Sequence, residues 1–149
     1  MKFSEMPYAR PDLDELKQQL QALTDQLRSA PDYASAHEAF LAQQKLSTHI
    51  DTLATLSSVR TSTDTRAKFY DAEEQYWNEP GPELRAYDDA WTAAMLESPF
   101  RKEFAAEYGD LMFVNAEIAL KTFSPAIVEE LKQENQLVQD YQKLIASAQ

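Results

Sequence analysis

The 149-residue chain contains no cysteine and only two glycines, Gly81 and Gly109. Without cysteine there can be no disulfides, thiolate nucleophiles or cysteine metal sites. The two glycines are too far apart for G-x-G-x-x-G or G-x-x-x-x-G-K-[ST], which excludes the usual nucleotide-binding loops. Sheets joined by tight hairpins generally need more glycine, so the shortage favours long helices with few breaks.

Basic residues and long apolar runs are also scarce. Fourteen Lys and Arg stand against 25 Asp and Glu, giving a net charge of −11. Nucleic-acid backbones and anionic membrane surfaces are therefore not expected partners, because this charge repels them. No apolar run approaches the length of a membrane span, and the first residues lack the pattern of a signal peptide. The sequence therefore predicts a cytoplasmic location.

The residues that are present are those of an ordinary soluble protein, with 44% apolar and 26% charged residues. A chain of this length can bury a hydrophobic core of its own. We therefore expect residues 1–149 to form a single domain. The apolar pattern continues almost to Gln149, which is compatible with a natural end and equally with a fragment cut inside or just after a helix.

Apolar residues recur every three or four positions along most of the chain, which predicts an all-α bundle of about seven antiparallel helices without a sheet. The first apolar stripe predicts a helix over residues 12–29, which Pro31 ends. Asp32 is expected to cap a second helix that runs to about residue 60. Breaks are expected at residues 61–65 and 79–82.

Four later helix boundaries follow from local signals. Ser98-Pro99 and Ser124-Pro125 each predict a helix with serine as its N-cap and proline at its first position. Gly109 is expected to end the first of these helices in a left-handed conformation, and Asp110 to begin the next.

Residues 35–43, SAHEAFLAQ, come one residue short of H-E-x-x-H, the helical zinc signature. Position 41 is Leu, so His37 lacks its partner one turn away. His49 lies about 18 Å along a straight helix and about 120° around it, too far to share a zinc ion with His37. Glu-x-x-His pairs and G-x-S-x-G are also absent. We therefore predict no catalytic or metal-binding residue in this chain, and interpret His37 as a partly exposed helical histidine.

Aromatic residues gather on both sides of the break at residues 79–82. Such residues can line a peptide groove, and aromatic side chains dominate recognition surfaces. More often they form the core, with the polar tips of Tyr and Trp at its edge. The candidates for a groove or interface are Tyr70, Trp77, Tyr87 and Trp91. The acidic cluster Asp71, Glu73 and Glu74 is interpreted as a solvated face.

Several segments, in order, resemble one family: MKFSEMPYARPDLDEL, TDTRAKFYDAEEQYW, SPFRKEF, NAEIALKTFSP and LIASAQ. The family is the oligoendopeptidase F branch of the thimet-type zinc metallopeptidases, and the resemblance covers essentially the whole chain. It implies the N-terminal helical portion of a longer hydrolase that cleaves short peptides in a deep channel. The implied zinc ion, its H-E-x-x-H helix and a downstream Glu ligand belong to the missing C-terminal catalytic part.

The resemblance therefore implies a non-catalytic segment that helps to wall the channel. Its expected partners are the catalytic part of the same polypeptide and, in the parent protein, short peptides. An isolated fragment is expected to expose an apolar patch through which it can self-associate. The alternative is a standalone helical module that binds peptides or proteins without enzymatic activity. A metalloenzyme built on His37 and Glu38 is the least favoured interpretation.

Overall fold

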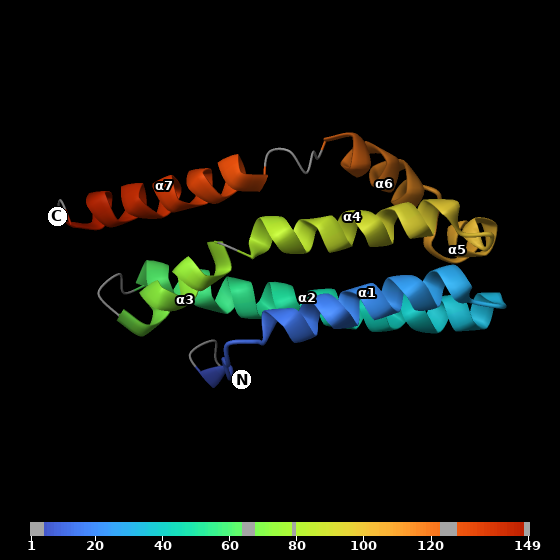
Figure 1. Cartoon of the computed structure of the whole chain (residues 1–149), viewed down its shortest axis with the longest axis horizontal. Coiled ribbons are helices and arrows are strands. Elements are labelled where there is room, and N and C mark those ends of the chain that lie inside the picture. Colours follow the sequence, from blue (N-terminus) through green and yellow to red (C-terminus); the bar gives the residue numbers. More distant parts are fainter. Residues whose placement is uncertain (1–4, 64–67, 79, 123–127, 148–149) are drawn as a thin grey trace.

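The computed structural model describes residues 5–63, 68–78, 80–122 and 128–147, and in these ranges the chain forms seven α-helices and no strand (Figure 1). This confirms the all-α prediction. The helices are α1 (Leu13–Ser29), α2 (Tyr33–Thr63), α3 (Lys68–Asn78), α4 (Gly81–Glu97), α5 (Arg101–Tyr108), α6 (Leu111–Thr122) and α7 (Val128–Ser147).

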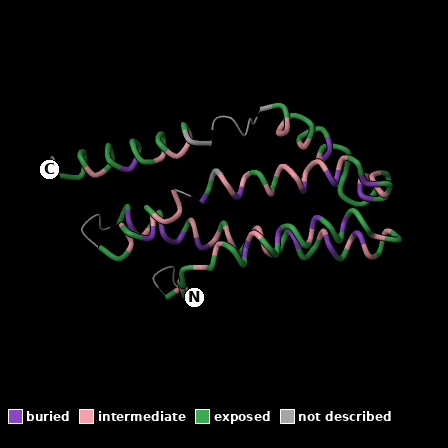
Figure 2. Tube along the Cα trace, viewed as in Figure 1, coloured by how far each residue is buried: buried purple, intermediate pink, exposed green. Residues whose placement is uncertain are grey.

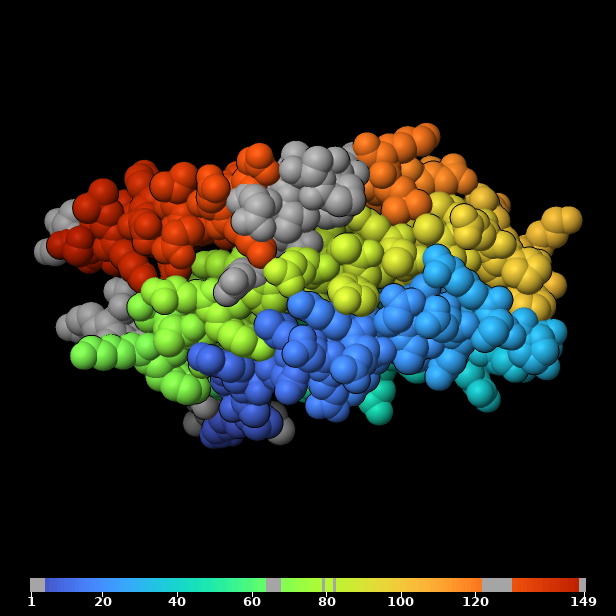
Figure 3. Space-filling model, in the orientation of Figure 1, coloured from blue at the N-terminus to red at the C-terminus, as the bar shows by residue number. Residues whose placement is uncertain are grey.

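Helices α1, α2, α4 and α7 lie roughly along one long axis and give an elongated molecule, whereas α6 is tilted to that axis (Figures 1 and 3). Helix α1 packs against both α2 and α4, and α2 runs antiparallel to these two helices. Helix α3 packs beside the C-terminal end of α2. Helix α6 packs on α4, and α7 packs on α3 and α4. No helix in the described ranges has the length and hydropathy needed to cross a membrane.

The core lies where α1, α2, α4, α5 and α6 meet. Its buried side chains are Leu27, Ala36, Ala39, Trp91, Ala94, Met95, Phe104 and Phe113. The alanines of α2 and α4 leave room for the large rings of the neighbouring helices, and such alternation of small and large residues gives close packing. Phe104 is completely buried and Trp91 is 7% exposed.

Capping side chains fix the first two helices where the sequence predicts them. Asp12 accepts hydrogen bonds from the backbone N–H groups of Asp14 and Glu15, at 2.9 and 3.1 Å. Asp32 accepts one from Ser35 at 2.8 Å, and this bond lowers the pKa of the Asp32 carboxyl. The second helix ends at Thr63, three residues later than predicted.

The predicted start of the fifth helix is wrong by two residues, because Ser98 and Pro99 belong to the turn before it. Ser98 ends α4, and its Oγ accepts a hydrogen bond from the N–H of Phe100 at 3.2 Å. Phe100 is the N-cap residue and Arg101 the first helical residue. The serine hydroxyl therefore stabilises the turn rather than the helix. The second Ser-Pro pair, at residues 124–125, lies outside the described residues.

Gly109 ends α5 with φ 90° and ψ 152°, and its N–H donates a hydrogen bond to the carbonyl of Ala105 at 2.9 Å. The positive φ agrees with the predicted left-handed conformation, whereas ψ is more extended than in a left-handed helical residue. Glycine adopts this backbone conformation without strain, whereas residues with a Cβ rarely do. The chain can therefore turn here before α6 begins at Leu111.

We expect Gly109→Ala to lower the free energy of unfolding by about 1–2 kcal/mol, because alanine would be strained at this φ. A Cβ at Gly109 meets no atom within 4 Å, so the loss would come from the backbone alone. Gly81→Ala is the matched control. Gly81 is in the first turn of α4, has no positive φ and also has open space around it. Urea denaturation should show this control to be neutral or slightly stabilising, and equal losses in both variants would contradict the explanation.

Candidate functional site

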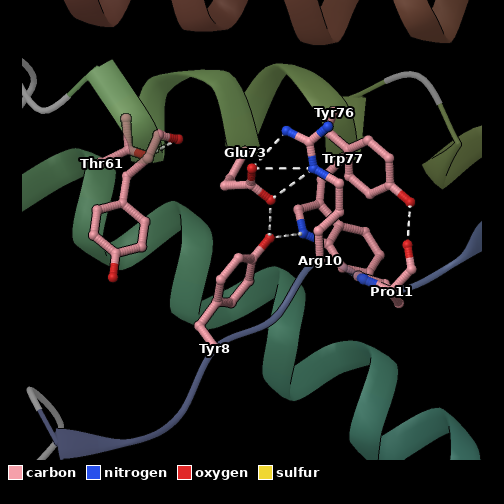
Figure 4. A network of polar contacts seen from close by, with 8 residues as sticks. Tyr8, Arg10, Pro11, Thr61, Glu73, Tyr76 and Trp77 are labelled. Carbon is pink, nitrogen blue, oxygen red and sulfur yellow. Dashed lines mark hydrogen bonds and ion pairs between the residues drawn. The ribbon is translucent and has the colours of Figure 1, made fainter.

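A buried carboxylate on α3 holds the segment that precedes α1 (Figure 4). Glu73 is 2% exposed. Its two oxygens accept hydrogen bonds from Arg10 Nε at 3.0 and 3.1 Å and from Arg10 Nη2 at 2.5 Å. The Tyr8 hydroxyl donates a further bond of 2.7 Å. The carboxylate therefore has charge-assisted bonds on both oxygens, the arrangement that makes a buried charge tolerable.

Aromatic residues of α3 complete this network. The Trp77 indole N–H donates to the Tyr8 hydroxyl at 3.1 Å, and the Tyr76 hydroxyl donates to the carbonyl of Pro11 at 2.6 Å. The Arg10 guanidinium lies 4.5 Å from the centre of the Tyr76 ring, within the range of a cation–π interaction. The N-terminal segment is thus fixed to α3 through both its side chains and its backbone.

The network also sets the protonation states of its members. Hydrogen bonds from Arg10 lower the pKa of Glu73, and this effect outweighs burial, which acts in the opposite direction. Burial, and then the bond to Glu73, raise the pKa of Tyr8 to about 12. At neutral pH the carboxylate is therefore ionised and the phenol keeps its proton. These are the states that the hydrogen bonds need, and they stabilise structure without providing a nucleophile.

The sequence interpretation of Glu73 as part of a solvated acidic face is wrong. Its partners Tyr8 and Arg10 are more than 60 positions away in the chain, and no local pattern identifies them. The sequence did contain one pattern that places Glu73 beside aromatic residues. Glu73 lies three residues after Tyr70 and four before Trp77, so all three share one face of α3.

The four aromatic groove candidates lie in three different places. Tyr70 accepts a hydrogen bond from Arg60 Nη1 at 3.0 Å and meets the Tyr8 ring edge-on, so Tyr70 and Trp77 both contact Tyr8. Tyr87 borders a shallow hollow between α1 and α4. Trp91 belongs to the core. The structure therefore brings Tyr70 and Trp77 to one cluster and leaves Tyr87 and Trp91 outside it.

His37 lies in an aromatic cluster at the start of α2. Its ring stacks on Tyr33 with 5.6 Å between centroids, and its Nε2 is 2.5 Å from the Tyr108 hydroxyl. Phe40, on the same helix, packs against Phe104 of α5. Among the described residues, no group of three or more His, Asp or Glu side chains could hold a metal ion. The geometry around His37 is that of helix packing.

Helix α7 packs with its polar side inward. Gln139 is 3% exposed, accepts from Asn78 Nδ2 at 3.2 Å and donates to Asp71 at 3.4 Å. Lys143 pairs with Asp71 at 2.5 Å, and Lys132 with Glu83 at 2.8 Å.

The apolar stripe of α7 faces solvent, at the positions i, i+1, i+4, i+7 and i+8 that share one side of a helix (Figure 2). Its members are Leu137, Val138, Tyr141, Leu144 and Ile145, all at least 49% exposed. Helix α6 exposes three more apolar side chains at similar spacing: Leu111, Val114 and Ile118. We call these eight side chains the outer apolar face. Soluble proteins rarely expose so many large apolar residues unless another surface covers them.

The comparisons with known proteins give one consistent result. A family model described as the peptidase M3 N-terminal domain matches residues 3–123. The chain is similar to the structure of a provisionally assigned oligoendopeptidase F, at 39% identity and a TM-score of 0.95 over 99% of this chain and 26% of that one. A structure of PZ peptidase A with an inhibitor gives 34% identity and a TM-score of 0.93, covering 98% and 26%.

A third structure, a provisionally assigned oligoendopeptidase F from Bacillus anthracis strain Ames, gives 30% identity and a TM-score of 0.90, covering 95% and 26%. A comparison with curated proteins gives no match. The chain thus spans about a quarter of the length of these structures, at their N-terminal end. The structural similarity includes α7, which lies beyond the residues that the family model matches.

We expect Glu73→Gln to lower the free energy of unfolding by about 2 kcal/mol at pH 7. The substitution removes the negative charge of the carboxylate, and hydrogen bonds to a charged group contribute more than those to a neutral one. The pKa of Glu73 is lowered in the folded protein, so its stabilisation is present above the ordinary value of 4.5. That stabilisation is lost as the pH falls through the lowered value. The difference between variant and wild type should therefore shrink in acid.

The control for this experiment is Glu38→Gln, which makes the same chemical change at an exposed position of α2. It should change stability by less than about 0.5 kcal/mol at any pH. Urea denaturation at pH 7 and at pH 3 measures both variants. A loss for Glu73→Gln that is the same at both pH values would show that its charge is not what matters.

Proposed function

The chain belongs to the peptidase M3 family, of which it carries the N-terminal domain, and on this premise we propose that it forms a non-catalytic wall of the substrate channel in a larger zinc oligopeptidase. The zinc ion, the H-E-x-x-H helix and the downstream Glu ligand would belong to the polypeptide that follows this domain. Short peptides would be hydrolysed between the two parts. The domain itself would supply shape and surface, and no reacting group.

The outer apolar face carries this proposal. A helix that buries its polar side and exposes its apolar side is unfavourable in water, at about 25 cal/mol for each Å² of apolar surface left exposed. The arrangement is favourable once a second apolar surface covers α6 and α7. The structures to which the chain is similar are about four times longer, so a chain of that length contains enough polypeptide to provide the covering surface.

The Glu73 network supports the same role, because it stabilises α3. A channel wall must keep its shape while peptides enter and leave, and α3 is held by the ion pair of its buried Glu73 carboxylate with Arg10 as well as by its packing on α2. Helix α7, which carries the exposed stripe, lies on the other side of α3 from the N-terminal segment (Figure 1). The domain thus has a stabilised inner layer and an outer face available for association.

The first experiment extends the gene sequence beyond the codon for Gln149 and produces the encoded downstream polypeptide as a separate chain. We expect that polypeptide to contain H-E-x-x-H, to bind zinc, and to hydrolyse short peptides efficiently only when the 149-residue chain is added. A stop codon directly after Gln149, or full activity without this chain, would contradict the proposal.

Leu144→Ser tests the surface itself. Leu144 is 66% exposed on α7, so the isolated chain should keep its stability within about 0.5 kcal/mol. Binding to the downstream polypeptide should weaken at least about tenfold, since burying a leucine contributes roughly 1.5–3 kcal/mol. Self-association of the isolated chain, measured by analytical ultracentrifugation, should also decrease.

Leu41→Ser is the matched control, because Leu41 is 51% exposed on α2 and lies outside the outer apolar face. It removes the same side chain without touching α6 or α7. Titration calorimetry with the downstream polypeptide should give the control the affinity of the wild type. Equal effects of the two substitutions would exclude the outer apolar face as the contact surface.

A further inference from the structure

A cavity of about 260 Å³ opens between α2, α4 and α6, away from both the Glu73 network and α7. Its deep part is apolar and is formed by Trp91, Met95 and Phe113, which are buried, with Phe40 and Met112 beside them. Sites for whole small molecules usually measure about 300–1,000 Å³. This cavity is therefore of a size for one long side chain.

Polar groups line the remaining part of the cavity. Gln43 is 5% exposed; its Oε1 accepts from Gln44 Nε2 at 3.2 Å and its Nε2 donates to Ser47 at 2.9 Å. An amide oxygen has two lone pairs, so this carbonyl can accept one more hydrogen bond. The Thr92 hydroxyl also lines the cavity, but it already donates to the backbone carbonyl of Asp88 at 2.7 Å. The polar side chains of the cavity can therefore mainly accept further hydrogen bonds.

Asp88 is the ionisable group of the cavity. Among the described residues, none makes a hydrogen bond or ion pair with its carboxylate. The charges that act on it are Asp51 from α2 and Arg85 and Asp89 from its own helix, and Arg85 is paired with Asp89 at 3.1 Å. Helix α6 lines the cavity with only Met112, Phe113 and Ala116. No cation of the described ranges therefore pairs with this carboxylate, whereas two other carboxylates act on it.

Surrounding protein, and then the neighbouring carboxylates, raise the pKa of Asp88 to about 6, although Arg85 opposes the shift. Asp88 is an exposed residue, so water still reaches it and its desolvation is only partial. The direction of the shift nonetheless shows that ionised Asp88 is poorly compensated in the free protein. A perturbed carboxyl in a cavity is a common mark of a functional site.

We propose that this cavity binds the side chain of an arginine residue in a peptide. The methylene stem would pack against Trp91 and Met95, as long cationic side chains do along apolar surfaces. The guanidinium would reach the carboxylate of Asp88 and the free lone pair of Gln43, since its planar fork of N–H donors fits two acceptors at once. The net charge of −11 further favours a cationic ligand.

This inference rests on the proposed function for the identity of the ligand as a peptide. Within that function it assigns a substrate preference: peptides with an arginine that reaches the wall while the scissile bond lies in the catalytic part. The binding itself can be measured on the 149-residue chain alone. Failure of the chain to associate with a downstream polypeptide therefore leaves the measurement intact, and the two proposals can fail separately.

The experiment titrates the ¹⁵N-labelled chain with acetyl-Ala-Arg-Ala-amide and with the same peptide carrying citrulline, which has nearly the shape of arginine but no charge. The chain has two tryptophans, so its NMR spectrum contains two indole N–H signals. We expect the arginine peptide to shift the Trp91 signal saturably and to leave Trp77 unchanged. The citrulline peptide should bind about tenfold more weakly, the factor that corresponds to ~1.4 kcal/mol.

Asp88→Asn should reduce the affinity for the arginine peptide to that for the citrulline peptide. Glu97→Gln is the matched control, because it removes one negative charge from an exposed position of the same helix and should keep wild-type affinity. The affinity of the wild type should fall about tenfold as the pH is lowered from 7 to 5, because Asp88 becomes protonated while the peptide keeps its charge. This pH dependence should be absent in Asp88→Asn.

Three results would overturn the proposal: no saturable shift of Trp91, equal binding of the arginine and citrulline peptides, or unchanged binding by Asp88→Asn. Tighter binding of a matching lysine peptide would overturn the assignment to arginine.

Unfolding of the Asp88→Asn variant can be distinguished from loss of the site. Asp88→Asn removes a carboxylate whose raised pKa makes its ionised form unfavourable at pH 7, so its melting temperature should equal or exceed that of the wild type there.

Discussion

The ion pair between Glu73 and Arg10 connects the start of the chain to its middle. It is the point at which the segment before α1 is joined to α3, and α3 in turn contacts α2, α4 and α7. A buried carboxylate without its partner is strongly unfavourable, so α3 cannot keep this orientation while the N-terminal segment is elsewhere. The positions of Asp71 and Asn78, to which α7 is attached, depend on that orientation.

Local chemistry made much of the fold predictable from the sequence. The leucine stripe of α1 and the capping carboxylates of Asp12 and Asp32 act within a few residues, and the helices begin where these signals predict. Gly109 was predictable for the same reason, because a positive φ is decided by a single residue. The helix start predicted at Ser98 was wrong, because a serine hydroxyl can stabilise either a turn or a helix start. Only the path of the backbone decides between the two.

The tertiary arrangement could not be predicted from the same patterns. A hydrophobic stripe shows which side of a helix avoids water, but it does not show whether the covering surface lies in the same stretch of chain. The stripe of α7 is as regular as that of α1, yet it faces outward, while Gln139 on the opposite side is buried. The candidate cavity was equally hidden: Trp91 was recognised as an aromatic candidate, but nothing local relates it to Gln43 on α2 or to Phe113 on α6.

The polar inner side of α7 has a consequence for how the domain responds to its surroundings. The core of α1, α2, α4, α5 and α6 is apolar, so salt should affect it little. The contacts of Lys132 and Lys143 with α4 and α3 are ion pairs with partly exposed partners, and dissolved ions screen such pairs over a distance of roughly 8–10 Å at physiological concentrations. Ionic strength therefore acts more strongly on α7 than on the apolar core: salt weakens the ion pairs that hold α7, while the buried apolar side chains of the core keep their packing.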